Sequence, residues 1–439
     1  MLEVVSTFRR LLDELSPVMT SPTFGSLIVV VTGWLFAPKR TITGMIQAAG
    51  AVGKKHHSAF HRLFASARWS MDEVGLAVMG IALRMLPGDE DVFLAIDDTL
   101  ARKRGLKVFG VGMHLDPLLS SRGKKIVNWG HSWVVLGVLM RMPLWKDRWF
   151  CLPVLARLYR SKQTLKGRMR EYRTRPELAV EMLEVVCQAR PNRHFHVVAD
   201  SSYSGKSVVK RLPDNCDLTG RMHMKAQLYA ALKPGCGRVK GRPRKRGQRL
   251  ASPEEMLGGK TREIEMDIYG RHEKAQVAEA EALWYKTAGS RALKVVAVRP
   301  KSGGRKKQAF YSTCFTASVV EVLSWYARRW SIEVTFHEVK GQLGFEEPQG
   351  WTRRAVERTA PMALMLYSLI VLWYAQEGHK KAMLANRPWY RSKDRAAFAD
   401  MLATLRRQSL RETFLNTPQW DRKSTKVIKA LVELCSKAA

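Results

Sequence analysis

The strongest constraint on the fold is a series of short, mainly apolar runs that begins after Asp91. Four of them have the length of strands and cover residues 92–96, 133–140, 150–158 and 195–199. A helix-like segment, Pro176–Arg190, precedes the last run. Continuous apolar runs indicate strands buried on both faces, and strands that alternate with helices are typical of an α/β sheet. We therefore predict an α/β core that begins near residue 91.

Helical regions flank this core. Residues 1–90 are predicted to be helical, and Thr41–Gly50 and Lys54–Ser70 form two amphipathic stretches around a glycine-containing turn. Such a pair fits a DNA-reading helix-turn-helix, or equally a helical hairpin with a solvated basic face. The last 60 residues are also predicted to be helical and basic. Ala360–Ala375 has too few apolar residues for a membrane span, so we expect a buried core helix there.

The chain divides into five segments. Residues 226–294 contain short alternating pieces that indicate a β-rich insertion. We therefore predict a helical DNA-binding domain at 1–90, a core at 91–225 and 295–345, the insertion at 226–294 and a C-terminal helical region at 346–439.

Charge limits the class of partner. The chain has 74 Lys+Arg against 39 Asp+Glu, a formal net charge of +35, and 46% hydrophobic residues. That apolar content excludes a disordered polycation, so a folded protein with a polyanionic partner is expected. Nucleic acid comes first, and a membrane surface is disfavoured because no lipidation motif is found. The six cysteines are scattered singly, which favours a reducing compartment, and we expect a cytoplasmic protein.

Three carboxylate positions favour metal chemistry. Asp97-Asp98-Thr99 ends one apolar run, Asp200-Ser201 ends another, and Glu333 lies within a predicted helix, 318–342. Acids at the ends of buried strands are costly unless a cation neutralises them, although aspartates that cap turns are the alternative. Side chains alternate along a strand, so only one of Asp97 and Asp98 can share a site with Asp200.

One face of the predicted helix gathers polar side chains around Glu333. At 100° per residue, an arc of about 80° holds five polar residues beside an apolar stripe: Tyr326, Arg329, Glu333, His337 and Lys340. This row is either a solvated face with an i,i+4 ion pair or a set of donors around one carboxylate. The second interpretation, which we favour, suits a phosphate backbone held against a metal. We favour a bystander role for His337.

These motifs resemble a known family. Tyr326-x2-Arg329-x3-Glu333-x6-Lys340 resembles the YREK signature of bacterial insertion-sequence transposases of the DDE type. The acids at 97–99 and the Asp-Ser-Ser-Tyr-Ser-Gly segment at 200–205 resemble that family's two aspartate motifs, and the resemblance runs from about residue 91 to 351. It implies an RNase-H-like mixed sheet with a β-rich insertion. The implied catalytic and metal-binding triad is Asp98, Asp200 and Glu333, with Asp98 preferred because the family's acid directly precedes Thr.

The resemblance also implies a function. Such an enzyme cuts DNA at the ends of an insertion sequence and joins the 3′ ends to target DNA. The triad would hold two Mg²⁺ ions, for which Mn²⁺ can substitute, and Tyr326, Arg329 and Lys340 would hold DNA phosphates. The implied partners are double-stranded DNA, as terminal inverted repeats and target, and a second copy in a homodimer on DNA. The alternatives are a transposase-derived nuclease that no longer transposes, or a DNA-binding protein without activity, which the full set of acids disfavours.

Two further DNA contacts are expected in the insertion. The run 240–247 resembles an AT-hook, whose slim Gly-Arg-Pro core lets arginines enter a narrow minor groove. The basic residues of this run that are expected to contact DNA are Arg242, Arg244, Lys245 and Arg246. A generic loop that contacts phosphates is the alternative. Related enzymes stack an aromatic of the insertion on a flipped base, which makes Trp284 a candidate, with a core position equally open.

Overall fold

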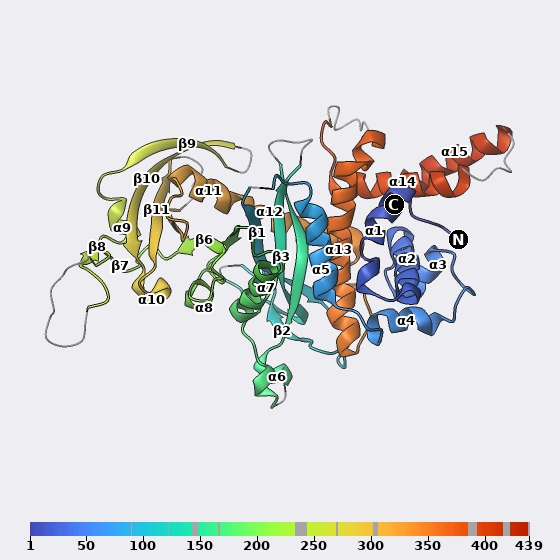
Figure 1. Cartoon of the computed structure of the whole chain (residues 1–439), viewed down its shortest axis with the longest axis horizontal. Helices are drawn as coiled ribbons and strands as arrows, with labels where there is room; N and C mark the ends of the chain where they lie inside the picture. Colours follow the sequence, from blue (N-terminus) through green and yellow to red (C-terminus); the bar gives the residue numbers. More distant parts are fainter. Residues whose placement is uncertain are drawn as a thin grey trace.

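The computed structural model describes residues 1–88, 90–121, 123–142, 148–165, 167–232, 244–268, 271–301, 306–384, 393–415 and 422–437. One mixed sheet of twelve strands runs through the molecule, with helices packed at its far end (Figure 1). The predicted α/β class is confirmed. The strand arrangement next to the helices is consistent with an RNase-H-like core.

The core of the sheet is built on β1 (Val92–Arg102). It pairs antiparallel with β3 (Val127–Arg141) and parallel with β5 (Phe195–Ala199), and β5 pairs parallel with β6 (Cys216–Met222). The other edge of β3 carries β2 (Gly112–Leu115) and β4 (Trp149–Tyr159). All four apolar runs form strands, because their side chains are buried on both faces.

Helices cover both faces of this core. α7 (Arg175–Ala189) begins with a capping box between Thr174 and Glu177 and packs on β3 and β4. α11 (Val319–Arg328) and α12 (Trp330–Leu343) follow one another, and α12 packs on β1 and β4. The short helix α6 (Lys162–Leu165) lies between β4 and α7, and α8 (Lys206–Val209) lies between β5 and β6.

The predicted strands of the insertion extend the core sheet. β12 (Gln308–Ser312) pairs with β6, and β11 (Ala292–Pro300), β10 (Arg271–Leu283) and β9 (Arg262–Ile268) follow in order. Four short elements complete this part: β7 (Leu228–Tyr229), β8 (Arg249–Leu250), α9 (Pro253–Met256) and α10 (Tyr285–Ala288). The described strands of the insertion therefore belong to the same hydrogen-bonded sheet as the core.

The N-terminal region is helical, as predicted. Its helices are α1 (Ser6–Asp13), α2 (Ser21–Phe36), α3 (Ile42–Ala48), α4 (His57–Ala65) and α5 (Met71–Leu83). A Cβ at Gly33 would lie 1.8 Å from the Met45 carbonyl oxygen, so α2 and α3 touch backbone to backbone. α3 and α4 occupy the two segments predicted as a helix-turn-helix.

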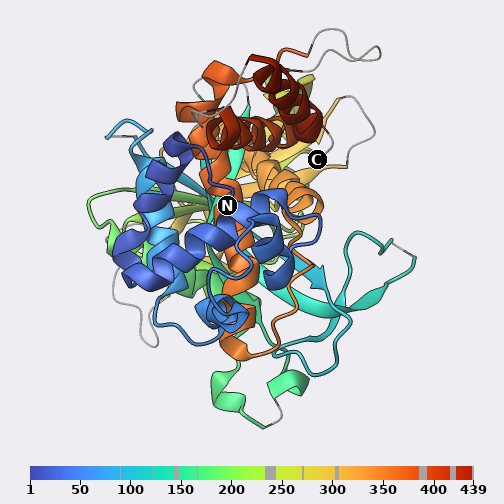
Figure 2. The same cartoon turned by 90° about the vertical axis from the view of Figure 1, so that its right-hand side faces the viewer.

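A long apolar helix joins the N-terminal helices to the sheet. α13 (Arg353–Gln376) contacts α1, α4, α5 and β4, and Figure 2 shows the N-terminal helices gathered beside it with the C-terminal helices above. In the described part of the chain it alone is long and apolar enough to cross a membrane, and 94% of its apolar window is buried inside the protein. The predicted core helix is confirmed. The chain ends in α14 (Phe398–Leu415) and α15 (Arg422–Lys437).

Candidate active site

A cavity of about 680 Å³ opens at the edge of the sheet where β1 and β5 lie side by side. Ile96 of β1 pairs with Ala199 of β5, so the chain places Asp97 and Asp200 at neighbouring positions one residue later. Glu333 enters the same cavity from the first turn of α12. Its lining thus includes four carboxylates, those of Asp97, Asp98, Asp200 and Glu333.

Arg329 joins the carboxylates of two elements. Its Nη1 donates to Asp97 Oδ2 at 2.5 Å and its Nη2 donates to Glu333 Oε1 at 2.7 Å. Burial raises the pKa of Asp97 to about 7; Arg329 opposes the rise and Asp200 adds to it. Burial would lower the pKa of Arg329, but Asp97, Tyr326 and Glu333 together raise it. The guanidinium therefore acts as the counter-ion of this side of the site.

Asp98 lines the same cavity but has different partners from Asp97. Its Oδ1 accepts a hydrogen bond from the Tyr203 hydroxyl at 2.7 Å, and its Oδ2 lies 3.4 Å from Arg175 Nε of α7. Burial raises the pKa of Asp98, and Arg175 opposes the rise. The two neighbouring acids have different partners, but the expectation that only one of them can share a site with Asp200 is wrong, because both line the cavity and Asp200 acts on both. The aspartate linked to Glu333 through an arginine is Asp97. The motif alone favours Asp98.

Asp200 stands between these two carboxylates. Its charge raises the pKa of both Asp97 and Asp98. Its own Oδ1 accepts the Ser202 backbone N–H at 2.8 Å, an Asx-type turn that fixes its side chain directly after β5. Asp200 therefore both caps a turn and lines the cavity, although the sequence alone leaves turn capping and a metal site as alternatives.

The predicted helix over 318–342 is two helices in the structure. They meet at Arg329, whose backbone is helical but whose N–H bonds to the Tyr326 carbonyl at 3.2 Å, three residues back. The tightened turn leaves most of the predicted row intact, because Arg329, Glu333, His337 and Lys340 all line the cavity.

Tyr326 departs from this row. It is 8% exposed, packs against Phe310 at 4.7 Å between ring centroids, and has its pKa raised by burial. The Arg329 guanidinium lies over its ring at 5.7 Å. Tyr326 therefore packs against the Arg329 guanidinium and does not itself line the cavity. Lys340 is half-buried, and burial lowers its pKa.

Sequence reasoning missed four polar partners of the site. Arg175 and Tyr203 hold Asp98, and Asp116 lines the cavity with Arg102, whose Nη2 lies 2.8 Å from its Oδ2. Tyr203 falls inside the second aspartate motif, which was a usable signal. Arg175 and Asp116 come from segments with no motif, so their roles depend on the fold.

The two contacts predicted in the insertion have different surroundings. Arg242 lies outside the described residues, while Arg244 and Lys245 are exposed. Arg246 lies over the rings of Tyr229 at 4.0 Å and Tyr285 at 5.3 Å. These cation–π contacts hold Arg246 against the insertion.

Trp284 lies at the junction of the insertion and the core. It is half-buried at the start of α10 and meets Tyr311 of β12 edge to face, with 5.5 Å between ring centroids. These contacts are those of a packing residue, which is the second of the two interpretations open from the sequence.

The donor set of the cavity suits a hard divalent cation. Four carboxylates offer oxygen ligands, which Mg²⁺ and Mn²⁺ prefer. Within the described ranges, no three His, Cys, Asp or Glu residues lie close enough together to hold a metal ion, and arginines lie among the acids instead. The raised pKa of Asp97 and Asp98 shows that burial still disfavours their charge. The chemistry of the site therefore fits a cation, provided that the carboxylates leave their arginine partners.

An RNase-H-like sheet with carboxylates gathered in one edge cavity defines a nuclease-like phosphoryl-transfer protein. A family model described as "DDE superfamily endonuclease" matches residues 15–287, more than half of the chain. The chain belongs to this family, whose members generally use divalent metals and act on DNA. The matched segment contains both aspartate motifs and ends before Glu333. The search of curated proteins found no match to the chain.

Proposed function

We propose that the protein is a DNA transposase of the YREK subgroup, which cuts at the ends of an insertion sequence and joins the 3′ ends to target DNA. The observation that carries this proposal is the cavity in which Arg329 of the YREK row bridges Asp97 and Glu333 beside Asp200. The net charge of +35 supports a double-stranded DNA partner. We further propose a homodimer on DNA in a bacterial cytoplasm.

The carboxylates would hold the metal. Two Mg²⁺ ions, or Mn²⁺ in their place, would stabilise the attacking and leaving oxygens of an in-line phosphoryl displacement. Glu333, Asp200 and one acid of β1 are the proposed ligands. The geometry favours Asp97 over the motif's Asp98, because Asp97 shares a counter-ion with Glu333.

The basic residues would orient DNA. Arg329 holds two carboxylates by charge, and a guanidinium in that place can also donate to a phosphate oxygen at the cut. His337 and Lys340 line the same cavity, about one and two turns after Glu333 along α12. Arg244, Lys245 and Arg246 would extend the contact along the DNA backbone, with Arg242 as the residue of the AT-hook core.

The test is strand cleavage in single carboxamide variants. Asp97→Asn, Asp98→Asn and Glu333→Gln are compared with wild type on a supercoiled plasmid that carries the DNA flanking the gene, with Mg²⁺ or Mn²⁺. We expect cleavage to fall by at least a hundredfold in Asp97→Asn and Glu333→Gln while DNA affinity changes little, and we expect Asp98→Asn to keep measurable cleavage.

Four outcomes separate the alternatives. Loss of cleavage in Asp98→Asn, with cleavage retained in Asp97→Asn, would identify Asp98 as the ligand, as the sequence motif implies. Undiminished cleavage in Glu333→Gln would overturn the site. Cleavage without joining of precut ends would identify a nuclease that no longer transposes, and binding without cleavage by the wild type would identify an inactive DNA-binding protein.

A further inference from the structure

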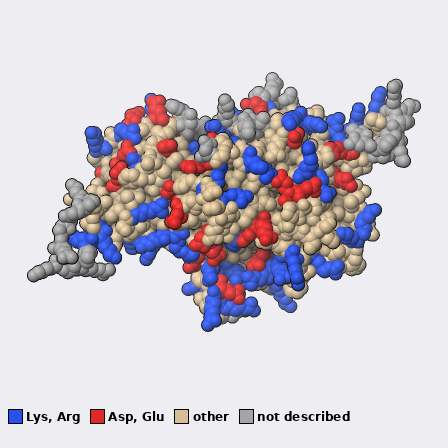
Figure 3. Space-filling model, viewed as in Figure 1, with Lys and Arg blue, Asp and Glu red and all other residues tan. Residues whose placement is uncertain are grey.

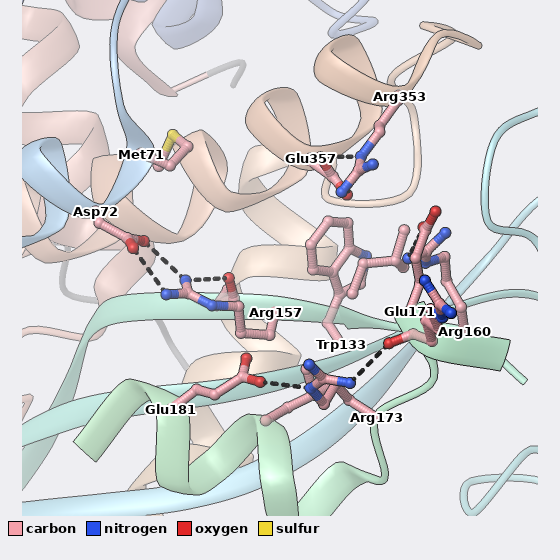
Figure 4. Close-up of a pocket in the computed structure, with 14 residues that line it drawn as sticks. Met71, Asp72, Trp133, Arg157, Arg160, Glu171, Arg173, Glu181, Arg353 and Glu357 are labelled. Carbon is pink, nitrogen blue, oxygen red and sulfur yellow. Dashed lines mark hydrogen bonds and ion pairs between the residues drawn. The ribbon is translucent and has the colours of Figure 1, made fainter. Parts of the chain in front are cut away.

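A second cavity, separate from the carboxylate site, is lined by arginines. It has a volume of about 550 Å³, within the range of roughly 300–1,000 Å³ that is usual for ligand sites, and it shares no lining residue with the carboxylate cavity. Its walls come from the start of α5, from β4, from α7 and from the start of α13, and Figure 4 shows them together. The arginines of this cavity, which we call the arginine pocket, are Arg157, Arg160, Arg170, Arg173 and Arg353.

Four of these arginines are held by carboxylates. Arg157 donates from both Nη atoms to the two oxygens of Asp72, at 2.8 Å each. The other three pairs are Arg160–Glu171 at 2.8 Å, Arg173–Glu181 at 3.1 Å and Arg353–Glu357 at 3.2 Å. Figure 4 shows these pairs around the pocket wall. Each pairing fixes a guanidinium in place and leaves some of its N–H groups free to donate to a ligand.

One positive charge is left over. The lining has five arginines and four carboxylates, and Arg170 has no carboxylate partner within the described ranges. It is exposed, at the short helical turn 169–171 that leads toward α7. The pocket therefore matches a ligand with a single negative charge.

A buried donor lies in the same wall. Trp133 of β3 is 1% exposed, and its Nε1 has no hydrogen-bond partner among the described residues. An unpaired buried N–H is costly, so a site that keeps one is suited to a ligand that brings an acceptor. In Figure 4 the indole lies between the Arg157 and Arg160 sides of the pocket. A monoanion with several acceptor oxygens, such as a phosphate diester, matches the single surplus positive charge and offers an acceptor to the Trp133 N–H.

The pocket is close to the carboxylate cavity. Thr99 lines that cavity and pairs in register with Trp133, which pairs in turn with Leu158 of the arginine pocket. Adjacent strands are about 4.8 Å apart, so the backbones of Thr99 and Leu158 lie roughly 10 Å apart across the sheet, about three nucleotide steps of a DNA strand. This proximity favours a phosphate of the bound DNA over a free anion.

The surface around the pocket is basic as well. Lys162, Arg168 and Arg170 are all exposed beside it, and Figure 3 shows Lys and Arg along the lower edge of the molecule around α6. We propose that the arginine pocket binds one phosphodiester of the DNA strand whose cut bond lies in the carboxylate cavity. This proposal rests on the proposed function, because it takes DNA as the substrate.

The test measures DNA binding without cleavage. Wild type, Arg170→Ala and Trp133→Phe are titrated against a fluorescent duplex in EDTA, at several salt concentrations. We expect Arg170→Ala to weaken binding about fivefold and to reduce the slope of log affinity against log salt by about 1, since one phosphate contact is lost. Trp133→Phe removes only a neutral donor, so binding should weaken about threefold with the slope unchanged.

The matched control is Arg411→Ala, which removes an exposed arginine from α14 and should leave affinity and slope unchanged. Arg170 is exposed, so its variant keeps the test valid even if Trp133→Phe lowers stability. Wild-type affinity and slope in both variants would overturn the pocket, and cleavage by the wild type would still stand. A wild type that binds no DNA would refute the proposed function itself.

A second arm separates DNA from a free anion. Inorganic phosphate is titrated calorimetrically into the wild type and into Arg170→Ala. Phosphate binding that is lost in Arg170→Ala, with DNA affinity unchanged in the same variant, would make the pocket a free-anion site and overturn the proposal. Loss of DNA affinity, with or without phosphate binding, supports it.

Discussion

Replacing Asp97 by Asn should stabilise the protein at alkaline pH, even though it removes a proposed catalytic group. Burial raises the pKa of Asp97 from its ordinary 3.8 to about 7, in spite of the neighbouring arginine. A carboxyl whose pKa is raised on folding favours the folded state below pH 4, and that contribution is lost as the pH rises through 7. At 1.36 kcal/mol per pH unit, the loss is about 4 kcal/mol above pH 7 and about 2 kcal/mol at pH 5.

The corresponding change in melting temperature can be worked out from chain length. Unfolding entropy of about 2.1 cal/mol/K per residue gives roughly 0.9 kcal/mol/K for 439 residues that unfold together. Asp97→Asn should therefore raise Tm by about 4 °C at pH 8 and by about 2 °C at pH 5. The assay is thermal unfolding from pH 5 to pH 8.5 without divalent ions. Asp214→Asn makes the same chemical change at an exposed position and should shift Tm by less than about 1 °C.

The opposite result has a definite meaning. A lower Tm for Asp97→Asn at pH 8 would show that the ion pair with Arg329 outweighs the cost of burial. It would refute the expected stabilisation. The metal supplies a second readout on the same samples. Added Mg²⁺ should raise the Tm of the wild type by mass action and leave that of Asp97→Asn nearly unchanged.

Two further substitutions test the packing around the site. A Cβ at Gly75 of α5 would lie 1.9 Å from the Val154 carbonyl oxygen of β4, so Gly75→Ala should cost about 1–3 kcal/mol, read as a lower urea midpoint; an unchanged midpoint would contradict this close approach. Trp284→Ala should lower stability by about 2 kcal/mol because its ring packs on Tyr311, with little change in DNA affinity. Weaker DNA binding at unchanged stability would instead identify Trp284 as a base-stacking residue.

The strands could be predicted where burial leaves a direct trace in the sequence. Residues 92–96 are apolar at every position, and residues 195–199 at every position except the buried His196, because both faces of β1 and β5 are covered. β2 leaves no such trace, since Met113 and Leu115 are 54% and 51% exposed and the strand has four residues. The break at Arg329 was missed for another reason: the polar row continues across it, so the periodicity does not change.

The acids could be predicted, but the contacts between them could not. Alternation along β1 predicts that Asp97 and Asp98 face opposite ways, yet it does not say which one faces α12. That choice depends on how the strand is oriented against the helix, which is set by packing over the whole sheet. The arginine pocket gives no signal either, because its five arginines come from β4, from the segment before α7 and from α13.

The arginines also change how the positive charge of this chain should be understood. A surplus of +35 explains attraction to DNA, but Arg329 and Arg175 are placed to neutralise acids of the protein itself. Their neutralisation is incomplete, because the pKa of Asp97 remains near 7 and that of Asp98 is also raised. A divalent cation between the carboxylates would remove this residual cost and free guanidinium groups beside the DNA phosphates. Metal binding and phosphate binding should therefore strengthen one another at this site. A cation at the carboxylates frees the guanidinium groups for a phosphate, and a phosphate that binds those groups frees the carboxylates for a cation.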